Sequence, residues 1–404
     1  MVLSVRAARL TATIGTMGLL AGCAGAPAPP SPSASASDGQ PTTEASAMAA
    51  PTSPTTGGSP RATDGPAPEG ALVIVVADEL RIRAEPGIDG AVVGSIGRGA
   101  VVRTNDGPIE ADGFRWYEVV DSIGREGWAA DGDGSDPWLS AIESTEDVTP
   151  LLTFGYGCDV VGPFNAPSTV VFDDGRVVMR DSDSPGYIVR RLSPAGVAHL
   201  EDNVVSSPYL QRSAEYMPVQ RADAGEPPGH GLCNFSFTVG TDAEPIVVRS
   251  VSWFGEEEET MFYEPAPERK ALDEIAHNLM VIDSVLDESS WETSGWLPFI
   301  AEEYVLWVGP GVGPAPGGLV AIDPDALPIE VDGFGEPAAS GRCATISREQ
   351  TFELARALNQ EVGAAAVRLD AVTFHEFEAN DTWMSLTLVP RTPRYELSCD
   401  DFSF

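Results

Sequence analysis

The sequence predicts a multidomain protein in which a disordered tether precedes a small all-β barrel and then an α+β region braced by disulfides. Residues 24–70 are mostly Pro, Ala, Ser, Thr and Gly, and such a segment cannot bury enough apolar surface to fold. Residues 71–142 hold several short β-branched runs separated by turn residues, which is typical of small barrels. From about Val148 onward, strand patterns mix with helical periodicity and with four cysteines.

The first 22 residues have the layout of a secretory signal peptide. Two arginines give a basic start, and the apolar stretch over residues 10–20 is too short to span a bilayer. The stretch ends in Leu20-Ala21-Gly22-Cys23, which resembles the lipobox of bacterial lipoproteins. The resemblance implies cleavage before Cys23, a diacylglyceryl group on its sulfur, and palmitate-like chains that hold the protein at the outer face of the cell membrane. The alternative is an ordinary signal peptide in which the cysteine occurs by chance.

Residues 23–70 comprise the lipidated cysteine and its tether. As a flexible coil, the 47 residues after Cys23 span roughly 40 Å. No later apolar run is long enough to cross a bilayer, so attachment would rest on the lipid alone. Two or three acyl chains are enough for stable attachment. We therefore expect a spacer that lifts folded domains off the membrane into the cell envelope.

The predicted barrel spans residues 71–142. Its strand patterns lie at residues 72–76, 80–83, 92–96, 101–102, 116–119 and 127–129. The order and spacing of Leu80-Arg81-Ile82-Arg83, Pro86-Gly87, residues 93–96 with Gly99, Trp116-Tyr117-Glu118-Val119 and Gly127-Trp128 resemble a bacterial SH3-like (SH3b) domain. An insertion over 105–113 and an acidic tail over 131–136 depart from the family pattern. The resemblance implies a binding or targeting module, aimed at cell wall or at other domains of the same chain, and does not imply catalysis.

The segment 149–288 carries signals for both hairpins and helices. Asp174-Gly175 predicts a tight turn between two β-branched runs. Ser193-Pro194 predicts a helix start, with a capping serine before a proline in the first turn. Phe235, Phe237 and Val239 alternate in a second predicted hairpin. The longest predicted helix opens at a proline, and its apolar stripe extends to Leu286.

The segment 295–404 is either a second α+β domain or a continuation of the first. Residues 304–308 and 383–389 have strand patterns, and Ser347 with Gln350 forms a capping-box pattern ahead of a helix. The whole region after the barrel is similar to uncharacterised envelope lipoproteins that carry SH3-like domains. That resemblance rests on element order and brings no assigned activity.

Cysteine usage divides into Cys23 and four others. In an oxidising compartment the four persist as disulfides, and three pairings are open to them. We favour Cys158–Cys233 and Cys343–Cys399, because each bond then closes a loop within one predicted segment. A zinc site is the alternative, but no two of these cysteines have the two-to-four-residue spacing that such sites use.

The composition argues against partners that carry strong negative charge. The 404 residues include 61 acidic and 24 basic side chains, which give a formal charge of -37. Nucleic acid and anionic headgroups would repel such a chain. We therefore expect no nucleic-acid partner, and no sequence motif leads us to expect a cofactor. The expected contacts are the membrane, through the lipid on Cys23, and peptidoglycan or an envelope protein.

We predict no enzyme, because the residues that nucleophilic hydrolysis needs are sparse. The histidines are His199, His230, His277 and His375, and no Gly-x-Ser-x-Gly elbow accompanies them. His230 lies in a predicted turn near Cys233, and the other three lie in predicted helices or strands, where structural roles are usual. Acidic residues are so abundant that a pair of carboxylates carries no information about glycoside hydrolysis.

Two further patterns bear on binding. Asp131, Asp133 and Ser135 have the opening of an EF-hand loop, but its sixth and twelfth positions lack the required glycine and glutamate. A turn is therefore the preferred interpretation, and no metal site is predicted. Tyr117 and Trp138 are amphipathic rings that can contact peptide or sugar where they are exposed, and packing in the core is the alternative.

The sequence thus predicts a non-catalytic, lipid-anchored cell-envelope protein whose SH3-like module binds cell wall or a protein partner. Two alternatives stay open. One is a cell-wall hydrolase whose catalytic domain lies unrecognised in 149–404, and histidine and cysteine usage argues against it. The other is an extracellular protease inhibitor or sensor with acidic loops held rigid by disulfides.

Overall fold

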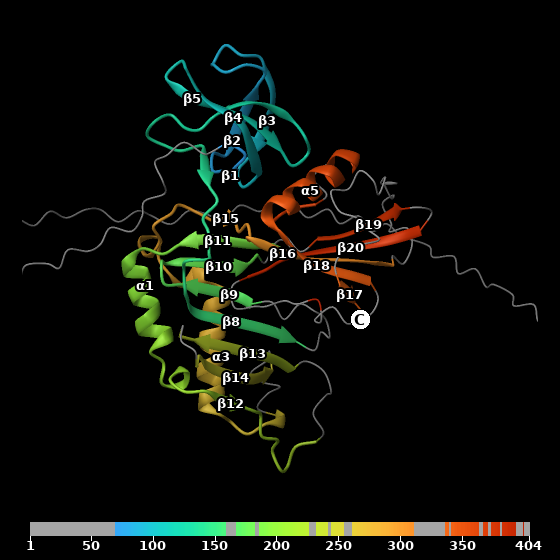
Figure 1. Cartoon of the computed structure of the whole chain (residues 1–404). Helices are drawn as coiled ribbons and strands as arrows, with labels where there is room; N and C mark the ends of the chain where they lie inside the picture. The colour runs from blue at the N-terminus through green and yellow to red at the C-terminus, as the bar shows by residue number, and fades with distance from the viewer. Residues whose placement is uncertain are drawn as a thin grey trace, which may run out of the picture. The chain divides into compact units, whose positions relative to one another are not determined.

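The computed structural model describes residues 69–158, 167–181, 186–225, 232–240, 244–253, 261–310, 336–338, 341–362, 367–370, 373–379, 382–392 and 399. The predictions for the signal peptide (1–22), for Cys23 and for nearly all of the tether therefore lie outside the described residues. Within them the fold is mostly β-sheet with some helices (Figure 1). The strands form three sheets, of seven, eight and five strands.

The seven-stranded sheet has the strand order β3-β2-β6-β5-β4-β1-β7. Its strands are β1 (Leu72–Val75), β2 (Glu79–Arg83), β3 (Val92–Gly97), β4 (Val101–Ala111), β5 (Phe114–Asp121), β6 (Glu126–Ala130) and β7 (Leu139–Ala141). Inward-facing residues of several strands, among them Val75, Ile82 and Val119, build one buried core. The insertion predicted at 105–113 continues β4 and pairs with β5, so that Ile109 lies opposite Trp116.

The eight-stranded sheet has the order β12-β14-β13-β8-β9-β10-β11-β15. Its strands are β8 (Pro150–Cys158), β9 (Pro167–Phe172), β10 (Arg176–Arg180), β11 (Tyr187–Arg191), β12 (Ala214–Tyr216), β13 (Leu232–Val239), β14 (Ile246–Trp253) and β15 (Leu297–Pro298). The hairpin predicted at Asp174-Gly175 is confirmed, because β9 and β10 pair antiparallel around that turn. The second hairpin is confirmed in β13 and β14, where Val239 pairs with Ile246.

Helices cover part of this sheet. They are α1 (Pro194–Leu200), α3 (Pro267–Met280) and α4 (Ile282–Val285), with the π-helical segment η1 (Glu201–Val205) and the short 3-10 helices η2 (Pro208–Leu210) and η3 (Glu288–Ser290). The predicted start of α1 is confirmed, because the Ser193 side chain accepts a hydrogen bond from the backbone N–H of Gly196 at 3.2 Å. The apolar stripe of α3, with Leu272 and Leu279, packs into the core beneath the sheet.

One expectation about the longest helix is wrong. The helix does not continue to Leu286, because α3 ends at Met280 and Val281 leaves helical geometry with φ -121° and ψ 34°. A β-branched residue loses side-chain freedom in a helix, which makes Val281 a favourable place to interrupt it. The interruption redirects the chain, and Ile282 and Leu286 still reach the same core.

The five-stranded sheet has the order β17-β18-β16-β20-β19, and every pairing in it is antiparallel. Its elements are β16 (Glu303–Pro310), β17 (Glu336–Ala338), β18 (Gly341–Ser347), α5 (Arg348–Val362), β19 (Thr373–Ala379) and β20 (Thr382–Pro390). The capping box predicted ahead of α5 is confirmed. Ser347 N donates to Gln350 Oε1 at 2.9 Å, and Gln350 N donates to Ser347 Oγ at 3.3 Å.

One apolar core is shared by all three sheets. It joins Ile74 and Val101 of the first sheet, Val178 of the second, and Leu306 and Leu388 of the third. Each of these side chains is buried, which means that the faces exclude water together. The seven-stranded sheet therefore depends for part of its burial on residues far along the chain.

Candidate functional site

A pocket of about 120 Å³ lies where the end of β7 approaches β11 and β15. Its wall is mainly apolar, and three arginines and one glutamate are among the residues that line it. The pocket occurs beside the chain that leaves β7 for β8. The apolar lining consists chiefly of Ile74, Ala141, Ile142, Val189, Leu297 and Phe299.

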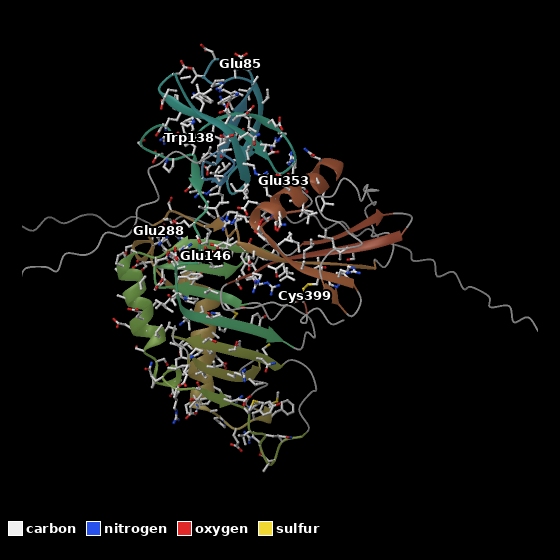
Figure 2. All side chains as sticks on the ribbon, in the orientation of Figure 1. Glu85, Trp138, Glu146, Glu288, Glu353 and Cys399 are labelled. Atoms are coloured by element: carbon white, nitrogen blue, oxygen red, sulfur yellow. A yellow bond between two sulfur atoms is a disulfide. The ribbon has the colours of Figure 1, made fainter. Side chains whose placement is uncertain are left out.

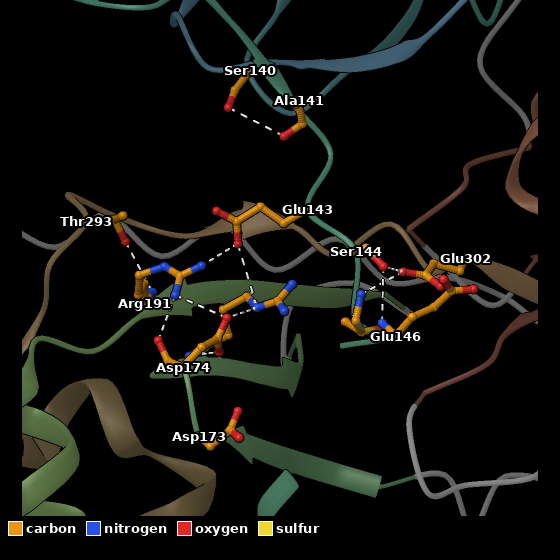
Figure 3. A network of polar contacts seen from close by, with 12 residues as sticks. Ser140, Ala141, Glu143, Ser144, Glu146, Asp173, Asp174, Arg191, Thr293 and Glu302 are labelled. Carbon is orange, nitrogen blue, oxygen red and sulfur yellow. Dashed lines mark hydrogen bonds and ion pairs between the residues drawn. The ribbon is translucent and has the colours of Figure 1, made fainter. Parts of the chain in front are cut away.

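Two of the arginines, Arg176 on β10 and Arg191 on β11, are register partners on adjacent strands. Like charges that lie directly opposite across a pair of strands repel one another. Carboxylates offset the repulsion here: Asp174 accepts from Arg176 Nε at 2.7 Å and lies 3.2 Å from Arg191 Nη1. Glu143 supplies the second carboxylate, since its Oε2 accepts from Arg191 Nη2 and lies 3.6 Å from Arg176 Nε (Figure 3).

The two carboxylates are held in different ways. Asp174 belongs to the β9–β10 turn and also accepts from the backbone N–H of Arg176 at 3.0 Å, so its position is tied to the hairpin. Glu143 arrives from the segment after β7, and its side chain is 48 % exposed against 25 % for Asp174. Glu143 is therefore the carboxylate that water and solutes can reach.

The charges around Arg191 act on its pKa. Burial lowers the pKa of this guanidinium, but the negative charges of Glu143 and Asp174 and the hydrogen bonds to them outweigh burial and raise it. Arg191 is thus cationic at neutral pH, as arginines in proteins are. A permanent cation at an apolar pocket is a feature that recognises anions.

The segment that carries Glu143 is held by hydrogen bonds directly after that residue. Beyond Glu143, the hydroxyl of Ser144 donates to Glu302 Oε1, and the backbone N–H of Thr145 donates to the same oxygen at 2.6 Å (Figure 3). Glu302 lies just before β16. The segment from 142 to 149, which we call the strap, therefore joins the arginines of the second sheet to the third sheet.

The third arginine, Arg190, points into a different environment. Its guanidinium lies 4.4 Å from the ring centroid of Trp291, and it donates to Asp283 at 2.6 Å and to Glu288 at 2.5 Å. The side chain is buried, and its charge is matched by these two carboxylates and by the ring of Trp291. Arg190 is therefore a structural residue, whereas Arg191 faces the pocket.

The two aromatic residues predicted as ligand contacts differ in accessibility. Tyr117 is only 1 % exposed and belongs to the core of the seven-stranded sheet, so its ring is packed rather than presented to solvent. Trp138 is partly exposed and stacks on Phe114 with ring centroids 5.7 Å apart (Figure 2). Of the two rings, Trp138 is the one that a peptide or sugar can reach.

The EF-hand-like residues form a turn. Asp133 Oδ1 accepts from the backbone N–H groups of Ser135 and Asp136, at 2.9 and 2.8 Å. These hydrogen bonds hold the pKa of the Asp133 carboxyl below its usual value, and the bond from Asp136 has the largest effect. Burial raises the pKa of Asp131, which pairs with Arg115 at 2.6 Å. Both carboxylates are thus engaged within the protein.

The four cysteines after the tether lie on two of the sheets or beside them. Cys343 on β18 forms a disulfide with Cys399, across a sequence separation of 56 (Figure 2). Cys233 on β13 is disulfide-bonded, and the register of the sheet puts Cys158 of β8 directly opposite it. Each of these cysteine positions lies on a β-strand except Cys399.

The remaining catalytic and metal candidates are dispersed. His199 lies in α1, His277 in α3 and His375 in β19, and His230 falls outside the described residues. Among the described residues, no three side chains of His, Cys, Asp or Glu gather as a metal would require. The described part of the chain also holds no helix of the length and apolarity that crossing a bilayer demands.

Sequence reasoning missed the pocket and its charged residues Glu143, Arg176 and Arg191. One signal was present: in a strongly acidic chain, Arg176 begins a predicted strand, and Arg190 and Arg191 end the strand that the structure shows next along the chain. An antiparallel pairing of those strands makes such residues neighbours. The contribution of Glu143 carried no comparable signal, because it depends on where the strap crosses the sheet.

The pocket, the strap and the partly exposed Trp138 are the features of the described residues from which function can be argued. Comparisons with protein-family models, with curated proteins and with solved structures found no match to the chain.

Proposed function

We propose that this protein is a non-catalytic, lipid-anchored protein of the bacterial cell envelope that binds cell wall through its SH3-like region. The proposed lipid attachment rests on one observation: Leu20-Ala21-Gly22-Cys23 ends an apolar stretch that follows a basic N-terminal segment. The long tether after Cys23, rich in Pro, Ala and Ser, suits a protein that works at a distance from its membrane.

The binding role rests on the region from 71 to 142. The order and spacing of its strand patterns resemble those of SH3b domains, and the resemblance implies targeting rather than catalysis. The partly exposed Trp138, stacked on Phe114, offers an aromatic surface of the kind that binds sugars and peptides. The acidic charge of the chain favours a ligand that is not itself strongly anionic.

The anchor is tested by metabolic labelling of cells with an alkyne analogue of palmitate. The full chain should take up the label, and Cys23→Ala should take up none. The matched control is Ser31→Ala, which alters a residue of the tether, leaves Leu20-Ala21-Gly22-Cys23 unchanged and should label as fully as the unchanged protein. Persistent labelling of Cys23→Ala would show that the lipid is elsewhere or absent from this site.

Wall binding is tested by co-sedimentation of the full chain with purified cell walls. Trp138→Ala should reduce the pelleted fraction several-fold. The control is Met217→Ala, which removes an exposed apolar side chain outside the SH3-like region. If the unchanged protein stays in the supernatant, the wall is not the ligand. In that case a protein partner becomes the proposal to pursue.

A further inference from the structure

We propose that the pocket between β7, β11 and β15 binds a small carboxylate with an apolar or aromatic body, whose carboxylate takes the place of Glu143 at Arg191. This goes beyond the proposed function and does not depend on the lipid or on wall binding. Three features of the pocket carry it.

The first feature is size and lining. An apolar cavity of roughly 150 Å³ is known to hold a benzene molecule, and this pocket has about 120 Å³ and an apolar wall. Ligand sites commonly combine such a wall with a few polar groups that fix orientation. The pocket therefore suits a single phenyl ring or a branched aliphatic group.

The second feature is the pair of arginines at its edge. Arg176 and Arg191 are register partners, so the pair requires negative charge beside it. Asp174 is tied into the hairpin by the backbone N–H of Arg176 and cannot leave without opening the turn. An incoming carboxylate would find Arg191 already oriented by Asp174, and a guanidinium binds a carboxylate with two parallel hydrogen bonds.

The third feature is the exchangeability of Glu143. Its carboxylate contacts Arg191 and Arg176 from a side chain that is 48 % exposed, so the side chain can rotate into solvent while Ser144 and Thr145 keep the strap hydrogen-bonded to Glu302. Exchange of Glu143 for a ligand carboxylate leaves the charge balance at the arginines unchanged. The ring of the ligand then covers apolar surface that Glu143 cannot cover. Glu143 therefore acts as an internal competitor that occupies the anion position when no ligand is bound.

The ligand class follows from these features together. A neutral molecule of the same shape could fill the apolar part but could not replace Glu143 at Arg191. A carboxylate without an apolar body would have no advantage over Glu143 at Arg191. Glu143 is attached to the protein, so its carboxylate is always close to the arginine. A phenylacetate-like anion satisfies both parts of the site.

The test is isothermal titration calorimetry on the full chain at pH 7, with phenylacetate as the probe and phenylacetamide as its neutral counterpart. We expect phenylacetate to bind with a dissociation constant of about 1 mM or tighter, and phenylacetamide to bind at least tenfold more weakly. Equal affinities for phenylacetate and phenylacetamide would overturn the proposal. So would the absence of binding heat from phenylacetate at about 10 mM.

Four variants then separate the carboxylate from the pocket. Arg191→Gln should weaken binding about tenfold or more. Glu143→Gln removes the internal competitor and should tighten binding several-fold. Glu146→Gln lies in the same strap, is exposed and removes the same charge, so it should bind as the unchanged protein does. Ala141→Phe fills the pocket from β7, breaks no ion pair, and should abolish binding with little change in melting temperature.

Each outcome has a meaning. If Glu143→Gln and Glu146→Gln bind alike, Glu143 is no competitor and the proposal fails. If Ala141→Phe binds normally, the ligand lies elsewhere and the proposal fails. Should Arg191→Gln unfold, the contrast between Glu143→Gln, Glu146→Gln and Ala141→Phe still decides the question.

Discussion

Arg103 on β4 forms an ion pair with Glu353 on α5, although 250 residues separate them in sequence. The Arg103 guanidinium also lies 4.9 Å from the ring centroid of Phe352, and Glu353 accepts from Arg356 at 2.5 Å. Nearby, Asn359 Nδ2 donates to the backbone carbonyl of Ser122 at 3.1 Å. The seven-stranded sheet is thus attached to α5 by polar contacts at the margin of the shared apolar core.

Replacement of Arg103 should destabilise the protein. Arg103→Met removes a partly buried ion pair and a cation–π contact, and we expect a loss of about 1 to 2 kcal/mol in the free energy of unfolding. The matched control is Arg81→Met on β2, an exposed arginine, with an expected change below about 0.5 kcal/mol. Urea unfolding measures both. Equal losses in the two variants would contradict a specific role for the pair.

The contribution of Glu353 should depend on pH. Burial raises the pKa of this carboxyl, but the hydrogen bonds and charges of Arg356 and Arg103 outweigh burial, so that the pKa lies below 4.5 in the folded state. Its stabilisation is fully present above about pH 4.5 and is lost as pH falls through the lower folded-state pKa. Glu353→Gln should therefore be destabilising at pH 7, and the difference from the unchanged protein should shrink towards pH 3.5. A difference that stays constant across this range would refute the assignment.

Substitution of Gly175 tests the tight turn that carries Asp174. Gly175 has φ +86°, and a Cβ there would lie 2.8 Å from the carbonyl oxygen of Leu192. Gly240 has the same φ, with nothing within 4 Å of such a Cβ. Both alanine variants should lose about 1 kcal/mol from backbone strain, and Gly175→Ala about 1 to 2 kcal/mol more from the clash. Thermal unfolding of the two variants measures both losses of stability. Equal losses would show that the turn at Gly175 relaxes without cost.

Disulfide pairing can be read directly from peptides. Proteolysis under non-reducing conditions should release one peptide pair that contains Cys343 and Cys399, and we predict a second pair that contains Cys158 and Cys233. Loss of the first bond in Cys343→Ala should cost about 4 kcal/mol, because its loop of 56 residues is long. A peptide that joins Cys233 to Cys343 would overturn this pairing.

Removal of residues 71–142 should disrupt the remainder of the chain. Leu72, Ile74 and Val101 contribute to the core that contains Leu306 and Phe352. A chain that begins at residue 143 would expose this apolar surface, and we expect it to bind a hydrophobic dye and to melt without a sharp transition. A cooperative transition at the temperature of the full chain would show that the seven-stranded sheet is a separable module.

Local sequence signals determined several elements correctly. The Asp-Gly turn at 174–175, the cap at Ser193 and the reciprocal box of Ser347 and Gln350 each act within a few residues. Their geometry is fixed by backbone conformation and by short hydrogen bonds, so the sequence is sufficient to predict them. The strand patterns at 304–308 and 383–389 are confirmed for a similar reason, since periodic burial marks strands wherever they pair. The end of α3 before Val281 was not predicted, because the periodicity of apolar residues does not show where a helix ends.

The tertiary structure decided which faces of the three sheets pack together, and these faces consist of residues far apart in the sequence. The sequence gives no indication that Leu297-Pro298 pairs beside β11, or that the strap carries Glu143 to Arg191. The burial of Tyr117 likewise depends on which side of β5 faces the core. Each of these contacts joins residues that are far apart along the chain, and their proximity arises only when apolar faces from all three sheets exclude water together. The sequence by itself therefore determined the local elements, and the tertiary structure created the pocket.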